Sequence, residues 1–97
     1  MTNAKRYVVV TTGRERRGVF GGEYVKGDVG GTVVLRDVRM AVYWSSDVHG
    51  VVGLAANGPT KACKISPAAP VIELDGVTAI MDMSPAAKEA WDKEPWG

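Results

Sequence analysis

The sequence predicts a mainly β (α+β) fold: a small antiparallel meander or partly open barrel of about five strands, with a short central helix and a short C-terminal helix. Valine dominates the apolar residues, and 12 glycines interrupt the valine-rich runs, as in strands joined by turns. Hydrophobic residues make up 45% of the chain and charged residues 24%, which is typical of globular proteins. Because 97 residues suffice for one core, we expect residues 1–97 to form a single domain.

The first half of the chain carries three strand patterns. Residues 7–12 are aromatic and β-branched, and residues 19–25 return after a polar loop at 13–18. A glycine-containing turn then leads into a third strand at residues 32–40.

The third strand has a mixed pattern. Simple alternation places Val34 and Val38 on one face and Val33 and Leu35 on the other. Charged residues among these apolar ones indicate a strand with only part of its length packed against the core, or one that twists between layers.

Two helix signals follow. Ser45-Ser46-Asp47 offers side-chain oxygens for a helix start, residues 51–56 have helical spacing, and Asn57-Gly58-Pro59 is a stop signal. Near the end of the chain, Ser84-Pro85 predicts the start of a second helix, in which Trp91 should face inward.

Residues 71–83 give the longest strand signal. Asp75-Gly76 lies inside it and indicates either a β-bulge or a tight turn. We expect a bulge, because the arms on either side are short.

The titratable residues argue against several kinds of chemistry. One histidine and one cysteine are too few for a zinc site and exclude an intrachain disulfide. We therefore expect no metal, no cofactor and no catalytic residues. An enzyme centred on His49 with Ser46 or Asp47 is the weaker alternative, since sequence adjacency is not the geometry of a triad.

Charge and hydropathy also restrict the partners. A net charge of +1 supplies little counterion-release drive, so nucleic acid is an unlikely partner. No stretch approaches the roughly 18 apolar residues of a membrane span, and the apolar run after Tyr7 is too short for a signal sequence. We expect a cytoplasmic protein that does not bind membranes.

Residues 43–64 form the most promising binding region. They combine adjacent aromatics with hydroxyls, amides and lysines, which can stack on a base and bind phosphate. Tyr43 and Trp44 should point to opposite faces of the strand, leaving one of them exposed. The expected ligand-binding residues here are Tyr43, Trp44, Ser45, Ser46, His49, Asn57, Thr60, Lys61 and Lys64.

Two further features bear on binding. Arg17 belongs to the loop Arg14-Glu15-Arg16-Arg17, whose guanidiniums could grip phosphate, although Glu15 weakens that interpretation. Trp96 lies beyond Pro95 near the end of the chain, and terminal aromatics together with exposed sheet edges favour a homo-oligomer.

The order of several motifs resembles a known family. Arg17-Gly18-Val19-Phe20-Gly21-Gly22 follows the opening strand, residues 34–39 and Tyr43-Trp44 come next, and Gly58-Pro59-Thr60-Lys61 continues the likeness over nearly the whole chain. The family consists of small uncharacterised proteins encoded by tailed phages and prophage-bearing bacteria. The resemblance implies an accessory or anti-defence role, and it carries over no catalytic residues.

These observations favour a non-enzymatic, oligomeric binding protein of phage type. It would hold a nucleotide-like ligand near residues 43–64 and could sequester an immune signal of the host. The alternative is a protein–protein interaction module that inhibits a host protein or serves as a phage accessory protein.

Overall fold

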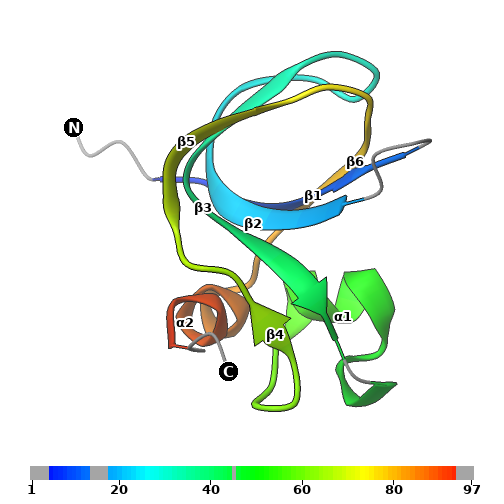
Figure 1. Cartoon of the computed structure of the whole chain (residues 1–97), viewed down its shortest axis with the longest axis vertical. Coiled ribbons are helices and arrows are strands. Elements are labelled where there is room, and N and C mark those ends of the chain that lie inside the picture. The colour runs from blue at the N-terminus through cyan, green and yellow to red at the C-terminus, as the bar shows by residue number, and fades with distance from the viewer. Residues whose placement is uncertain (1–4, 14–17, 45, 94–97) are drawn as a thin grey trace.

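The computed structural model describes residues 5–13, 18–44 and 46–93. Its elements confirm a mainly β fold with a short central helix and a short C-terminal helix (Figure 1). The strands are β1 (Tyr7–Thr12), β2 (Gly18–Gly27), β3 (Val33–Tyr43), β4 (Lys64–Ile65), β5 (Ala69–Leu74) and β6 (Val77–Asp82). The helices are α1 (Gly50–Ala56) and α2 (Pro85–Lys93), and a 3-10 turn, η1 (Ser46–Val48), precedes α1.

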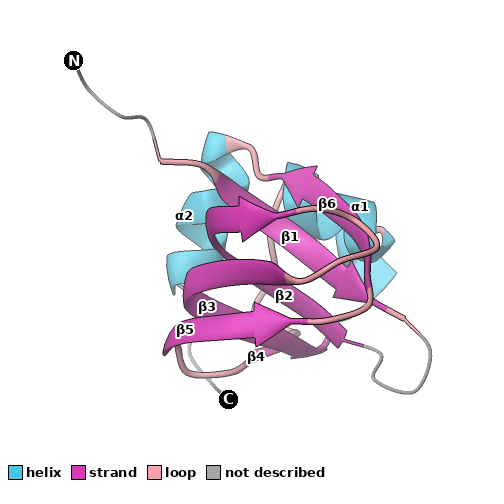
Figure 2. Cartoon of the chain, turned by 90° about the horizontal axis from the view of Figure 1, so that it is seen from above, coloured by secondary structure: helices cyan, strands magenta, loops and turns pink. Residues whose placement is uncertain are grey.

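The strands form one antiparallel sheet in the order β4-β3-β2-β1-β6, with β5 also paired to β3. Strands β1, β2 and β3 form the expected meander, whereas β6 returns to pair with β1. The sheet curls strongly, and both helices lie on the same side of it (Figures 1 and 2). One face of the sheet therefore packs against helices, and the other encloses a core of its own.

Strand β1 contributes to both cores, because successive side chains of a strand point to opposite faces. Val8 and Val10 belong to the inner core, and Val9 belongs to the helix-side core. Burial on both faces explains why this strand reads as an unbroken apolar run. The inner core contains Val8, Val10, Val33, Leu35, Val38, Leu74 and Val77. The helix-side core contains Val9, Val19, Ala41, Val48, Leu54, Ala55, Cys63, Ile65, Ala87 and Trp91.

Strand β3 contains a bulge that the sequence prediction missed. Asp37 has a left-handed backbone with φ +52°. Between the pairs Gly21↔Arg39 and Glu23↔Arg36, β3 advances by one residue more than β2, which is the signature of a bulge. The expected alternation was therefore wrong for Val38, which joins the inner core instead of sharing a face with Val34.

The prediction of a bulge at Asp75-Gly76 was also wrong. These residues form a tight turn between β5 and β6, with Gly76 at φ +65°. The hydroxyl of Thr32 donates to Asp75 Oδ1 at 2.7 Å and supports the turn. The two strands pair with β3 and β1 rather than with each other, so the turn redirects the chain between distant parts of the sheet.

The central helix starts differently from the prediction. Ser46–Val48 forms a separate 3-10 turn, and the residue that precedes α1 is His49, at φ +64° and without a side-chain capping bond. The expected cap at Ser45-Ser46-Asp47 was therefore wrong, with Ser45 itself outside the described residues. The predicted stop is confirmed: Asn57 N–H donates to Gly53 O at 2.8 Å, and Gly58 has φ +83°.

The predicted start of the C-terminal helix is confirmed. Ser84 Oγ accepts the N–H of Ala87 at 3.0 Å, as an N-cap does. The same hydroxyl donates to the carbonyl of Ala56 at 2.5 Å, and Ser84 N–H donates to Ala55 O at 3.0 Å. The start of α2 thereby caps the end of α1, and the two helices form one layer.

Candidate functional site

The two aromatic residues of the expected binding region separate as predicted. Tyr43 is 52% exposed at the end of β3, where it pairs with Lys64 of β4. Trp44 is half-buried and packs against the helix-side core. Trp44 therefore has a structural role, and Tyr43 is the aromatic open to a ligand or partner.

Most of the polar residues of that region that the structure describes are exposed. Ser46, His49, Asn57, Lys61 and Lys64 are exposed. Thr60 is half-buried, and its backbone N–H lies 3.4 Å from Cys63 Sγ. Ser45 and Arg17 lie outside the described residues, as do Arg14, Glu15, Arg16 and Trp96.

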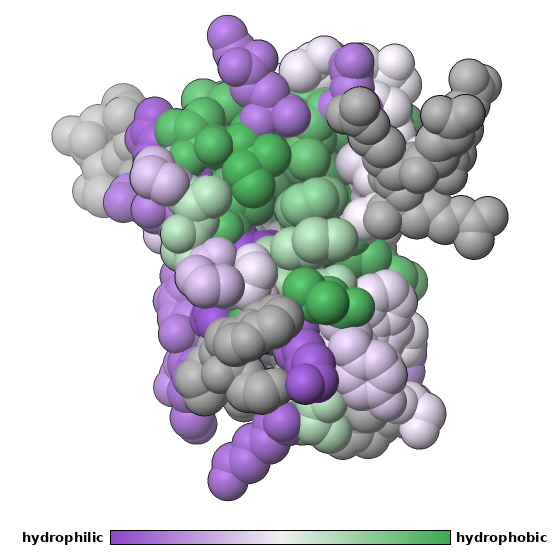
Figure 3. Space-filling model, viewed as in Figure 1, coloured by the Kyte–Doolittle hydropathy of each residue, from purple (hydrophilic) through white to green (hydrophobic). Residues whose placement is uncertain are grey.

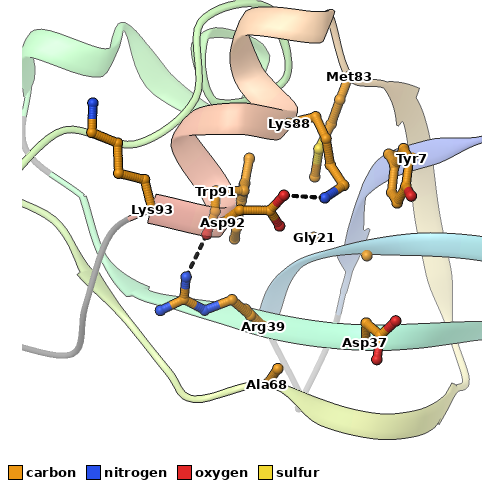
Figure 4. Close-up of a pocket in the computed structure, with 11 residues that line it drawn as sticks. Tyr7, Gly21, Asp37, Arg39, Ala68, Met83, Lys88, Trp91, Asp92 and Lys93 are labelled. Atoms are coloured by element: carbon orange, nitrogen blue, oxygen red, sulfur yellow. Dashed lines mark hydrogen bonds and ion pairs between the residues drawn. The ribbon is translucent and has the colours of Figure 1, made fainter.

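A groove between α2 and the strands β2 and β3, here called the α2 groove, has a volume of about 560 Å³ and is lined by both charged and apolar residues (Figure 4). This size lies within the usual range for small-molecule sites. Segments far apart in the sequence build it, and sequence reasoning did not find it. Its lining residues are Tyr7, Gly21, Gly22, Asp37, Arg39, Ala68, Met83, Lys88, Trp91, Asp92 and Lys93.

Gly21 and Trp91 set the inner wall of the α2 groove. A Cβ atom at Gly21 would lie 2.9 Å from the indole of Trp91 and 2.7 Å from Met83 Cε. The missing side chain lets the indole lie directly on β2, where Trp91 is only 2% exposed. This confirms that Trp91 faces inward and explains why glycine stands at position 21.

Lys88 of α2 contacts both Asp92 and Tyr7. Its ammonium forms an ion pair with Asp92, four residues along the helix. It also lies 4.3 Å from the centre of the Tyr7 ring, which is cation–π geometry. These contacts hold Tyr7 of β1 against α2 at one end of the groove (Figure 4).

Arg39 fastens the other end of α2 to the sheet. Its Nε donates to the carbonyl of Ser66 at 2.7 Å, and one terminal nitrogen donates to the carbonyl of Trp91. Because Trp91 belongs to the last turn of α2, the guanidinium satisfies a helix C-terminal carbonyl and complements the helix dipole. Lys93 is exposed in the same last turn.

Asp37 contributes the open acceptor of the α2 groove. Its side chain is exposed, and among the described residues no hydrogen bond or ion pair engages its carboxylate. Both Asp37 and Arg39 belong to β3, so one strand brings an anionic and a cationic group to the same cavity.

A second, more apolar groove lies between the end of β3 and α1, and we call it the β3–α1 groove. Its volume is about 430 Å³, and none of the described residues that line it is charged. Val42 is 50% exposed, and two residues of the expected binding region, Trp44 and Val51, contribute to the groove. Figure 3 shows apolar side chains gathered over the strands on one face of the molecule. The lining residues are Thr11, Thr12, Gly13, Gly18, Val19, Met40, Ala41, Val42, Trp44 and Val51.

Two other kinds of site were sought in the part of the chain that the structure describes. No cluster of three or more His, Cys, Asp or Glu side chains there could hold a metal ion. Neither described helix has the length and apolarity needed to cross a bilayer.

Comparison with known families shows to which family this chain belongs. Residues 5–91 match the family described as "Domain of unknown function (DUF6948)". The chain belongs to the DUF6948 family. No curated protein and no solved structure matches this DUF6948 chain. The matched range contains the whole described lining of the α2 groove except Asp92 and Lys93.

The residues of the α2 groove left weak signals in the sequence. Lys88 and Asp92 have the i,i+4 spacing of a helical ion pair, and Asp37 is a charged residue within the mixed pattern of the third strand. Neither signal shows that α2 packs across β2 and β3, because that depends on tertiary contacts of Trp91 and Arg39.

Proposed function

We propose that this chain is a non-enzymatic binding protein that holds a nucleotide-like anion in the α2 groove. The observation that carries the proposal is the composition of the groove: three cationic side chains, two anionic ones and an apolar wall in one cavity of about 560 Å³. Ligand sites of this size combine apolar surface with a few placed polar groups. In a phage setting, such binding would sequester a nucleotide immune signal in the host cytoplasm.

The charges of the groove favour an anion. The described lining carries three positive charges and two negative ones, a net charge of +1. The cations are Arg39, Lys88 and Lys93, and the anions are Asp37 and Asp92. Ammonium groups bind phosphate as point charges and guanidiniums bind it through directed N–H groups. The field at the α2 end of the groove is therefore positive, although the whole chain is almost neutral.

The apolar wall favours a ligand with a flat, poorly hydrated part. Tyr7, Met83 and Trp91 provide aromatic and thioether surface beside the charges. The described lining residues include no Ser, Cys or His, so they form no Ser–His or Cys–His pair of nucleophile and base. Both facts support binding rather than turnover.

The test is calorimetric titration of the protein with mononucleotides, cyclic dinucleotides and ADP-ribose, using two matched charge reversals. Lys93→Glu changes an exposed lysine of the α2 groove, and Lys61→Glu changes an exposed lysine of the sequence-predicted region. We expect Lys93→Glu to weaken binding several-fold and Lys61→Glu to leave it unchanged. The reverse result would place the ligand at residues 43–64, and no heat with any nucleotide would contradict the proposal.

A protein–protein interaction module is the second candidate function, and the β3–α1 groove favours it. The described lining of this groove is largely apolar and includes Val42, which is 50% exposed, and such surfaces mark contacts with other chains. The partner is either a second copy in a homo-oligomer or a host protein.

Sedimentation equilibrium and pull-down from host lysate separate these partners, with Val42→Asp as the disrupting variant. A homo-oligomer that Val42→Asp dissociates would identify a second copy. A monomer that captures one stoichiometric protein, lost in the variant, would identify a host partner. A monomer that captures nothing would contradict this candidate function.

A further inference from the structure

We propose that Asp37 determines the specificity of the α2 groove by accepting two N–H groups from the edge of a guanine base. This inference rests on the proposed nucleotide-binding function and adds the class of base. The ligand would then be a guanine nucleotide with its phosphate toward the cationic end of the groove.

The first argument is the placement of Asp37. Its carboxylate lines the groove, is exposed, and has no hydrogen-bond or ion-pair partner among the described residues. In Figure 4, Asp37 and Lys93 lie at opposite ends of the groove with Arg39 between them. A ligand that spans the groove meets an acceptor at one end and positive charge at the other.

The second argument is the backbone of Asp37. The bulge requires a left-handed residue at this position, with φ +52°, and glycine or asparagine would meet that requirement at least as well. The bulge therefore explains the backbone of residue 37 and does not explain its negative charge. The carboxylate lines the α2 groove and has no partner among the described residues, so it can accept hydrogen bonds from a ligand.

The third argument is chemical. An ionised carboxylate only accepts hydrogen bonds, and its two oxygens suit two parallel donors. The Watson–Crick edge of guanine presents such a pair, the N1–H and the exocyclic 2-amino group. Hypoxanthine lacks the amino group, and adenine presents the acceptor N1, which a carboxylate repels. A site of this kind discriminates by loss of a paired hydrogen bond.

The experiment compares GMP, IMP and AMP by calorimetry on wild-type protein, Asp37→Asn and Asp37→Gly. Wild-type protein should bind GMP about tenfold more tightly than IMP or AMP, which is the effect of one good paired contact. Asp37→Gly should bind the three nucleotides alike. Thermal unfolding provides a separate readout, in which both variants should remain folded because their backbones accept the left-handed conformation.

Asp37→Asn provides a positive signature that a structural role would not produce. Its amide presents one acceptor and one donor, which matches the N1–H and the 2-oxo group of xanthine. The variant should therefore lose affinity for GMP and gain affinity for XMP.

The outcomes separate the two proposals. Equal affinities for GMP, IMP and AMP, or GMP binding that survives Asp37→Gly, would overturn the role of Asp37 and leave the α2 groove as a general anion site. Absence of binding by every nucleotide would overturn the proposed function and the role of Asp37 together.

Discussion

The indole Nε1 of Trp91 donates a hydrogen bond of 3.0 Å to the carbonyl oxygen of Leu54, joining α2 to the last turn of α1. The last carbonyls of a helix have no partner within the helix. In α1 the carbonyl of Gly53 accepts from Asn57, Trp91 satisfies Leu54, and Ser84 satisfies the next two. The C-terminal end of α1 is therefore built around two residues of the C-terminal segment.

Trp91→Phe should destabilise the fold, because it leaves the Leu54 carbonyl without its donor in a buried position while it keeps an aromatic ring. We expect the free energy of unfolding to fall by about 1–3 kcal/mol. Urea denaturation measures this change. Trp44→Phe is the matched control: Trp44 packs on the same core without such a bond among the described residues, so a loss as large as that of Trp91→Phe would contradict the argument.

Ser84→Ala should remove two hydrogen bonds at once, the N-cap to Ala87 and the bond to Ala56 O. The cap alone is worth about 1 kcal/mol, so we expect a larger loss in the free energy of unfolding than for a simple cap. Ser84→Asp retains the cap and cannot donate to Ala56. The stability of Ser84→Asp relative to the wild type in chemical denaturation therefore reports the bond to Ala56, and the difference between Ser84→Asp and Ser84→Ala reports the cap. A Ser84→Asp variant as stable as the wild type would show that the bond to Ala56 contributes nothing.

Gly21→Ala should loosen the packing of α2, because its Cβ would lie 2.7 Å from Met83 Cε and 2.9 Å from the Trp91 ring. Forced repacking of this kind costs about 1–3 kcal/mol. Gly31→Ala is the control, since its nearest atom would be 3.6 Å away and its backbone is not left-handed. Fluorescence of the tryptophans during thermal unfolding should show a lower Tm for Gly21→Ala and little change for Gly31→Ala.

Gly76→Ala tests the tight turn between β5 and β6. No atom lies within 4 Å of the added Cβ, so the cost comes from the backbone at φ +65° alone. We expect about 1–2 kcal/mol. Gly76→Asn should cost less, because asparagine tolerates this conformation. If alanine and asparagine have the same effect on the free energy of unfolding, the left-handed turn does not limit stability.

Local patterns were enough to predict the elements whose signals lie within a few residues. The valine run of β1, the stop after α1 and the cap at Ser84 are all of this kind. The bulge at Asp37 was not predictable, because it depends on which residue of β2 lies opposite. Asp75-Gly76 was misread for the same reason: turn and bulge differ in the pairing of the flanking strands, which the sequence does not show.

The candidate site was the least predictable feature. Residues 43–64 looked promising because polar and aromatic side chains are close together in the sequence, but closeness in sequence does not show which side chains share a cavity. The α2 groove instead gathers Tyr7, Asp37 and Lys88 from three distant segments. Tertiary contacts bring them together: the packing of Trp91 on Gly21 and the hydrogen bonds of Arg39 to the carbonyls of Ser66 and Trp91.

The sharing of β1 between the two cores has a consequence for how the molecule unfolds. Val8 and Val10 are locked into one core and Val9 into the other, and each is 0% exposed. Opening either core exposes a side chain of β1, and β1 is also paired on both edges with β2 and β6, so we expect the sheet and the helix layer to unfold as one cooperative unit. The amide protons of β1 should therefore exchange with solvent only when the whole chain unfolds, at a rate that reports its global stability.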